Sequence, residues 1–449
     1  MTVAALESLP MTPAELEVFL TNFTNAVRVD VTPSYEELKR DGRYVEGLHG
    51  RRDPVGRLKR EILRLEGGGV FLFTGQIGSG KSTELMRLRA ELAAETAVKA
   101  YYCDLTEWLN LNEPVSLGSF LVALLSAWVE TVGNIRAQQT PAERLWNFFR
   151  NTRILPQGFE VGADGAGLKA KVGFALQTDP AFREHVSDAL RKHQASIVEQ
   201  ARDFVAQLKA DLCPRGEKCV LIADSLEKLR GYGEHSEAIY TSLQQLFLSD
   251  GKALQLPGVH VVYSVSPFLI EQNNQLPAQL GMGAVATMPS VHVFQRASSQ
   301  EDSDGVDAMV RLIATRFPRW PLVFKDAQLR RMARQSGGDL RDFFRSIRVV
   351  LNDDIEQLPA TDEMVEYALQ QICPPKAIPN EHVAWLARLE ASHEPELSEK
   401  ISSLTLQQYL TSKHVLVYLN GSAWYAVHPM LRDWVTNRAA TLAASAAAG

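Results

Sequence analysis

Short continuous runs of hydrophobic residues recur along this chain, and stretches with a helical period separate them. The runs span residues 70–74, 98–104, 219–224, 259–264 and 285–294, the last interrupted by Pro289. Strands that are apolar on both faces, with helices between them, are typical of a parallel sheet covered on both sides. The pattern therefore predicts an α/β fold.

A long insertion, residues 105–218, separates the second run from the third. Its pattern predicts an apolar helix near residues 117–130, a helix rich in Trp and Phe around Trp146, and a hairpin over the alternating segment 159–176. A final helical pattern covers residues 180–212, which would be roughly 50 Å long at 1.5 Å per residue. We expect a helix of this length to project or to lie across the surface.

The C-terminal third of the chain has a different pattern. Residues 301–373 are helical throughout, whereas residues 376–438 predict helices followed by two apolar runs that Asn420-Gly421 joins. Asn-Gly between apolar runs is a strong hairpin signal, so this segment predicts a winged helix. The expected parts are an arm (1–42), a core (43–300) that contains the insertion, a helical lid (301–375), a winged-helix-like domain (376–438) and an Ala-rich tail (439–449) that is a frayed helix or disordered.

Composition narrows the class of protein. The chain has 449 residues, of which 45% are hydrophobic, and a net charge of −6, which argues against a chain-wide nucleic-acid-binding surface. We find no signal peptide, and the apolar run 120–129 is too short to span a membrane. Four scattered cysteines suit a reducing cytoplasm. Cys213 and Cys219 could pair as metal ligands, but core packing is the better interpretation because no second pair lies near them.

The candidate chemistry begins directly after the first apolar run, where the chain fits G-x-x-x-x-G-K-[ST]. Strand, glycine-rich loop and helix are the context that a phosphate-binding loop needs, because the backbone N–H groups must point at a phosphate. Lys81 would contact the β- and γ-phosphates, and the Ser82 hydroxyl would bind Mg²⁺. The predicted cofactors are ATP and Mg²⁺, bound by Gly75, Gln76, Ile77, Gly78, Ser79, Gly80, Lys81, Ser82 and Thr83.

Three polar residues near the ends of the later strands are candidate catalytic groups. Asp224 ends the third run and could hold Mg²⁺ together with Ser82, although an Asp there could also cap a helix. Glu227 could act as the base for the attacking water or be an ordinary surface residue, and we weigh these equally. Ser264 ends the fourth run and could touch the γ-phosphate or serve a structural role.

A basic helix face follows the sequence Gly337-Gly338-Asp339. Arg341, Arg345 and Arg348 recur at helical spacing, with apolar residues on the opposite face. A solvated basic stripe would give the same pattern. The two glycines, however, would allow the helix to begin close to another backbone, which favours Arg341 reaching a phosphate.

In this order and spacing, the motifs resemble those of AAA+ ATPases, on the origin-recognition and STAND side of that group. Residues 420–429 further resemble the NGxxWYxVHP hairpin of stand-alone bacterial AAA-family ATPases. The resemblance covers residues 43–438 and implies a P-loop NTPase sheet with an all-α lid and a winged-helix domain. It makes Asp224 the Walker-B residue, Ser264 sensor 1 and Arg341 sensor 2, and it places residues 44–52 near the adenine. It also implies nucleotide-controlled assembly, and some relatives act in bacterial defence.

Two departures from that pattern bear on the rate of hydrolysis. Ser225 stands where many such enzymes have a Glu after the Walker-B Asp, and residues 253–295 contain no Arg or Lys that could act as an arginine finger. Such a finger can contribute ~10³-fold or more to the rate. The sequence therefore predicts a slow ATPase switch, with a nucleic-acid-remodelling ATPase and an ATP-bound scaffold without turnover as alternatives.

The expected partners follow from the charge of the winged helix. From residue 376 to the end, six basic residues are balanced by six acidic ones, and the candidate recognition helix 404–413 carries one cation. Tyr418, Trp424 and Tyr425 make the hairpin aromatic and neutral, which favours protein docking over DNA binding. We expect a homo-oligomer or a partner protein bound through the insertion and the winged helix, with no membrane association. A basic groove around Lys169 and Lys171 would favour nucleic acid instead.

Overall fold

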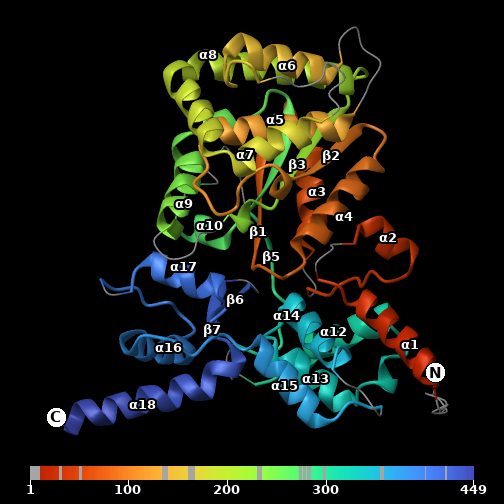
Figure 1. Cartoon of the computed structure of the whole chain (residues 1–449), viewed down its shortest axis with the longest axis vertical. Helices are drawn as coiled ribbons and strands as arrows, with labels where there is room; N and C mark the ends of the chain where they lie inside the picture. Colours follow the sequence, from red (N-terminus) through yellow and green to blue (C-terminus); the bar gives the residue numbers. More distant parts are fainter. Residues whose placement is uncertain are drawn as a thin grey trace. The chain divides into compact units, whose positions relative to one another are not determined.

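The computed structural model describes residues 11–29, 33–49, 53–133, 140–159, 167–229, 235–272, 276, 280, 285–296, 300–353, 358–399, 401–419 and 422–448 (Figure 1). The chain forms two compact units. The first unit contains Met1–Asp53, Gln76–Gly80 and Met288–Gly449, and the second contains Pro54–Gly75 and Lys81–Thr287. Each unit has hydrophobic cores of its own.

A five-stranded sheet organises the second unit. Its strands are β1 (Gly69–Gly75), β2 (Val98–Asp104), β3 (Lys218–Asp224), β4 (Val259–Val265) and β5 (Ala286–Met288), in the order β2-β3-β4-β1-β5. β1 pairs with β4, β4 with β3 and β3 with β2, all in parallel. The α/β fold class is confirmed, and the first four strands lie where the apolar runs predict them.

The fifth strand is much shorter than the predicted run 285–294. β5 ends at Met288, directly before Pro289. Proline has no N–H to donate to a strand ladder, so the pairing stops there. Among the described residues directly after it, an isolated bridge pairs Phe294 with Glu301.

Helices flank the sheet and supply its packing faces. In sequence order they include α3 (Pro54–Arg64), α4 (Lys81–Ala93), α9 (His235–Gln244) and α10 (Pro267–Gln272). α4 buries Leu85, Leu88 and Leu92 on the face that the sequence predicts. The last two of these leucines are one helical turn apart, so they pack as a continuous stripe.

The insertion is helical and covers the sheet with its own apolar face. It contains α5 (Leu117–Val132), α6 (Pro141–Thr152), α7 (Phe174–Thr178) and α8 (Pro180–Leu212). α8 has the predicted span but bends at His193, whose φ of −135° and ψ of 32° are not helical. Because Val186, Ile197 and Val205 on one side are buried and α8 packs against α5 and α6, the helix lies across the insertion rather than projecting from it.

The hairpin predicted over residues 159–176 is wrong in its described part. Lys169–Gly173 forms a π-helical turn that continues into α7, while residues 160–166 lie outside the described chain. Leu168, Val172 and Ala175 are buried. That spacing of four and three residues is helical, and it outweighs the alternation that suggested a strand.

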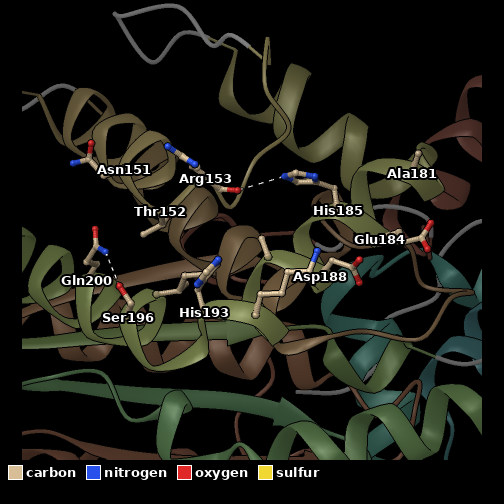
Figure 2. Close-up of a pocket in the computed structure, with 13 residues that line it drawn as sticks. Asn151, Thr152, Arg153, Ala181, Glu184, His185, Asp188, His193, Ser196 and Gln200 are labelled. Atoms are coloured by element: carbon tan, nitrogen blue, oxygen red, sulfur yellow. Dashed lines mark hydrogen bonds between the residues drawn. The ribbon is translucent and has the colours of Figure 1, made fainter.

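A hollow of about 630 Å³ lies between the end of α6 and the bent α8. Figure 2 shows side chains of both helices directed toward it, with His185 Nε2 placed 3.4 Å from the carbonyl oxygen of Arg153. Its charged residues are of both signs, since Arg153 and Lys192 lie alongside Glu184 and Asp188. The lining of the hollow is therefore not of a single charge.

The first unit joins the N-terminal arm to the helical lid. The arm forms α1 (Pro13–Ala26) and α2 (Tyr35–Arg40), and the lid contains α12 (Ser303–Arg316), α13 (Asp326–Gln335), α14 (Leu340–Leu351) and α15 (Asp362–Ile372). The buried Phe23 ring stacks on Phe317 with centroids 4.3 Å apart. The arm is thus part of the core of the lid.

The C-terminal segment of the first unit has the predicted helices and hairpin. They are α16 (Asn380–Ser392), α17 (Ser403–Thr411), β6 (Val415–Leu419), β7 (Ala423–Val427) and α18 (Arg432–Ala448). β6 and β7 pair antiparallel, while the Asn420-Gly421 turn itself lies outside the described residues. Residues 439–448 of the Ala-rich tail continue α18 as helix.

Among the described residues, no helix combines the length and the apolar character that crossing a membrane requires.

Candidate nucleotide-binding site

The glycine-rich loop has the setting that the sequence predicts. β1 ends at Gly75 and α4 begins at Lys81. Gly78 and Gly80 have φ values of 91° and 92°, which glycine adopts without strain. The Ser79 hydroxyl is buried and has no hydrogen-bond partner among the described residues. An unsatisfied buried donor in such a loop fits a phosphate ligand.

Lys81 is held at the first turn of α4 by two polar contacts. Its Nζ donates to the Gly75 carbonyl oxygen at 2.9 Å and lies 3.5 Å from Oε1 of Glu227. Lys81 and Glu227 are 4% and 6% exposed, so the ion pair is buried within the second unit. The cation predicted for the phosphates and the carboxylate predicted for the water therefore lie together.

A left-handed residue directs Glu227 into this position. Ser225 has a φ of 80°, and a 3₁₀ turn at Leu226–Lys228 follows it. The turn brings Glu227 back to the end of the sheet, where its carboxylate accepts a hydrogen bond from the Ser264 hydroxyl. Burial raises the pKa of Glu227, but the charge of Lys81 and the Ser264 hydroxyl outweigh burial, so its pKa is lowered. An ionised carboxylate is the form that can accept a proton.

Asp224 is fully buried at the end of β3, where its carboxylate accepts hydrogen bonds from a side chain and from the backbone. The Tyr102 hydroxyl donates to Oδ2 at 2.6 Å, and the Ser225 N–H donates to Oδ1 at 2.7 Å. Burial and the negative charge of Glu227 raise the pKa of Asp224, whereas hydrogen bonds from Tyr102 and Ser82 oppose that shift. The Ser82 hydroxyl and the Asp224 carboxylate thus meet, and such oxygen ligands fit Mg²⁺.

Tyr102 was not among the predicted site residues. It lies near the end of β2, the strand next to β3, and pairs in register with Ile222. The carboxyl ends of parallel strands are where α/β proteins bind ligands, and this placement is the signal that could have identified Tyr102.

In the first unit, the start of α14 lies against the phosphate loop. A Cβ placed on Gly78 would lie 2.7 Å from Cγ of Asp339 and closer still to both carboxylate oxygens. A Cβ on Gly80 would lie 3.6 Å from Cδ1 of Leu340. Gly338 approaches the Val291 carbonyl so closely that a side chain would collide with it. Gly338 therefore allows the close backbone approach that the sequence predicts, whereas the Cα of Gly337 faces the Leu416 side chain.

Arg341, two residues beyond Asp339, is exposed, and its contact with a phosphate stays a prediction. Arg345 does not belong to a purely solvated stripe, because its Nη1 lies 3.2 Å from Oδ1 of Asp342. The Nζ of Lys413, which precedes β6, lies 2.9 Å from Oδ2 of Asp339 and 2.6 Å from Oδ2 of Asp342. The count of charged residues in the winged helix did not reveal that Lys413 pairs with the carboxylates at the start of α14.

A second contact joins the phosphate loop to β6. Oε1 of Gln76 accepts hydrogen bonds from the Val417 N–H at 3.2 Å and from the Ser290 hydroxyl at 3.3 Å. Both contacts are buried. The loop is therefore bonded to the winged helix through Gln76 and lies against the lid through Gly78.

The segment predicted near the adenine is described up to residue 49. The His49 ring nitrogen Nδ1 lies 2.9 Å from the Pro289 carbonyl oxygen, and burial lowers the pKa of His49 to about 4. Residues 50–52 lie outside the described chain, so the adenine contact stays a prediction.

No family model and no curated protein matches the chain. Solved structures do match. The ORC2 protein of Aeropyrum pernix in its ADP form is 13% identical, with 93% of this chain and 97% of that chain covered and a TM-score of 0.45. Cdc6p of Pyrobaculum aerophilum is 12% identical, with 93% and 97% covered and a TM-score of 0.38. The RuvB branch migration motor of Thermotoga maritima is 11% identical, with 92% and 98% covered and a TM-score of 0.34. Origin-recognition and Cdc6 proteins are the branch that the motifs resemble, and at these identities the activity has to be argued from the residues of this chain.

Proposed function

We propose that this protein binds Mg-ATP, hydrolyses it slowly, and uses its nucleotide state to control conformation and assembly. The observation that carries the proposal is the buried cluster at the ends of β1, β3 and β4. There Lys81 contacts Glu227, Ser264 donates to Glu227, and Asp224 meets Ser82. A cation, a base and a pair of metal-binding oxygens are the parts that phosphoryl transfer to water needs.

Each residue has a role that its surroundings support. Bound Mg-ATP would supply the transferable phosphoryl group and the metal charge. The N–H groups of the glycine-rich loop and Lys81 would hold the phosphates, and Ser82 and Asp224 would hold the metal. Glu227, whose pKa is lowered, would take the proton of the attacking water, and Ser264 would orient its carboxylate.

Slow turnover is supported by the contacts that the Glu227 carboxylate would have to break before it could act as a base. Its carboxylate is paired with Lys81 and hydrogen-bonded to Ser264, so it must exchange these partners to reach a water molecule. Residues 253–295 also lack an Arg or Lys that could serve as an arginine finger. Both features favour a switch over a motor.

Control of conformation is supported by the contacts of the loop within the first unit. Val417 is bonded to Gln76, and Lys413 is paired with the carboxylate that abuts Gly78. A phosphate that shifts the loop would act on both contacts at once. Ligand moves such an equilibrium only by its differential affinity for the two forms.

The partner is a second copy or another protein. Two of the winged-helix cations are engaged, since Lys413 pairs with Asp339 and Arg432 Nε lies 2.9 Å from Glu390. In the insertion, Lys169 pairs with Glu107 at 2.6 Å. Paired cations neutralise fewer phosphates, which disfavours the nucleic-acid alternative. A role in bacterial defence rests on the motif resemblance alone, and neighbouring genes would test it.

The proposal is tested by light scattering after size exclusion, with ADP and with a slowly hydrolysed ATP analogue. We expect the analogue to change the mass of the wild type, and Arg341→Ala to lose this response while ADP binding is kept. A guanidinium–phosphate bond contributes about 1.5–3 kcal/mol, roughly a 10- to 100-fold change in populations. Arg348→Ala, on the same helix, is the control.

An unchanged response in Arg341→Ala would remove this residue from the switch. The same samples should bind duplex DNA weakly in an anisotropy titration at physiological salt. Submicromolar binding with a steep salt dependence would instead favour the nucleic-acid alternative.

Glu227→Gln is expected to keep ATP binding and to slow hydrolysis by about 10²-fold or more, because the amide cannot accept the proton of the water. Phosphate release under saturating ATP measures the rate, and calorimetry measures the affinity. Glu237→Gln, a first-turn residue of α9, is the matched control. Turnover equal to that of the wild type would show that another group is the base, whereas loss of ATP binding would assign Glu227 to structure.

A further inference from the structure

Two buried thiols of the second unit lie outside the nucleotide site. Cys213 follows α8 as its C-terminal cap and is 6% exposed, whereas Cys219 is the second residue of β3 and is fully buried. Asp224 lies at the opposite end of the same strand. The pair therefore joins the end of the insertion to the strand that carries the predicted metal ligand.

A tight turn brings the two cysteines together. The Gly216 N–H donates to the Cys213 carbonyl oxygen at 3.1 Å, and the φ of Gly216 is 79°. The Lys218 N–H donates to the Ala97 carbonyl oxygen at 2.8 Å, which fixes the start of β3 against β2. The chain thus reverses within six residues, and the two cysteines are buried in the same hydrophobic cluster, where each affects the pKa of the other. No third His, Cys, Asp or Glu among the described residues joins them as a possible metal ligand.

The surroundings distinguish the two sulfurs. The hydrogen bond from Cys219 lowers the pKa of Cys213, and Lys209 and Lys99 act in the same direction against burial and Glu217. The same hydrogen bond, together with burial, raises the pKa of Cys219. The thiolate, the nucleophilic form of a cysteine, is therefore favoured at Cys213 over Cys219.

Cys103 provides the contrast within the same unit. Its sulfur lies 3.4 Å from the Thr131 hydroxyl, and burial raises its pKa to about 12. A buried thiol of high pKa is inert toward oxidants.

We propose that Cys213 and Cys219 form a reversible disulfide when the protein meets a peroxide. The Cys213 thiolate attacks one peroxide oxygen, the O–O bond breaks, and hydroxide leaves with a proton as water. The Cys219 sulfur then attacks the sulfenic sulfur of Cys213, and the S–O bond breaks to release a second water. Two thiols lose two electrons, the peroxide gains them, and a small thiol reductant restores the pair by exchange.

The test uses the full chain treated with hydrogen peroxide, quenched, unfolded and alkylated. The reduced protein has four titratable thiols. Oxidation is expected to leave two thiols, to remove two hydrogen atoms from the intact mass, and to be reversed by dithiothreitol. Trypsin cuts after Arg215 and Lys218, so the disulfide appears as a linked pair of peptides.

Three variants separate this pair from general oxidation. Cys103→Ser should oxidise as the wild type does. Cys219→Ser lacks the second thiol, so its Cys213 should stop at a sulfenic acid that dimedone traps. Cys213→Ser should give neither the linked peptides nor the adduct.

Several results would overturn the proposal. They are four remaining thiols in the folded, oxidised wild type, linkage to Cys103, Cys373 or a second chain, and no dimedone adduct in Cys219→Ser. If a variant fails to fold in a thermal melt, the peptide map of the wild type decides by itself.

Discussion

Replacing Lys81 by alanine is expected to lower the affinity for Mg-ATP by roughly 10- to 100-fold, because a charge-assisted bond to phosphate contributes about 1.5–3 kcal/mol. The loop N–H groups remain in the variant, but they carry no full charge. Isothermal calorimetry measures the loss. Lys59→Ala is the matched control in the same unit, since the Nζ of Lys59 lies 2.9 Å from Oε1 of Glu95, which follows the end of α4. An affinity equal to that of the wild type would refute the phosphate-loop assignment.

The same substitution also acts on stability, and the two effects can be separated. Lys81 is the buried counter-ion of Glu227, so its removal leaves a carboxylate whose burial raises its pKa. Breaking one side of a buried pair typically costs about 3–5 kcal/mol. The double variant Lys81→Ala/Glu227→Gln should regain much of that stability, as followed by denaturant unfolding, while ATP binding stays lost. Recovery of binding would mean that Lys81 acts only by neutralising Glu227.

Replacing Gly78 by alanine is expected to disrupt both the loop and the start of α14. Two costs combine. A positive φ strains a non-glycine residue by about 1–3 kcal/mol. The new methyl group would also overlap the Asp339 carboxylate, and overpacking of this kind typically costs about 1–3 kcal/mol. Asp339 cannot move away freely, because it accepts from the Asp342 N–H at 2.9 Å and pairs with Lys413.

A matched control isolates the overlap from the backbone strain. Gly158 has a φ of 85°, and a Cβ there would meet no described atom within 4 Å. Gly158→Ala should therefore show the strain alone, while Gly78→Ala should lose more thermal stability and most of its ATP affinity. Differential scanning calorimetry and ATP titration measure the two quantities. Equal losses in both variants would show that the α14 contact does not constrain the loop.

The parts of the fold that the sequence predicts are those fixed by local patterns. Four strands, three of them buried almost throughout, and the helix that begins at Lys81 follow from hydrophobic runs and from the glycine-rich loop between β1 and α4. The hairpin predicted over residues 159–176 is wrong in its described part, because the small residues there allow both an alternating and a helical pattern. Packing of Leu168 and Val172 in the insertion core decides in favour of helix, and this packing is not local.

The candidate site likewise contains residues that local motifs predict and residues that only the folded chain brings together. The loop and the carboxylates at the strand ends can be found from motif spacing. Tyr102 lies 122 residues from Asp224, and Lys413 lies 71 residues from Asp342. No spacing rule connects such pairs, since they meet only when the sheet and the winged helix are assembled. Glu227 could be found from its spacing to Asp224, but its orientation could not. The orientation of its side chain depends on the left-handed φ of Ser225, a conformation that serine rarely adopts.

The bond between Gln76 and Val417 has a consequence for comparative and mutational studies of this protein. Its donor is a main-chain N–H, which every residue except proline carries. Side-chain replacement at position 417 would therefore leave the bond in place, and paired substitutions among homologues would not mark it. An alanine scan of the strand would miss this link, whereas Val417→Pro would remove its donor.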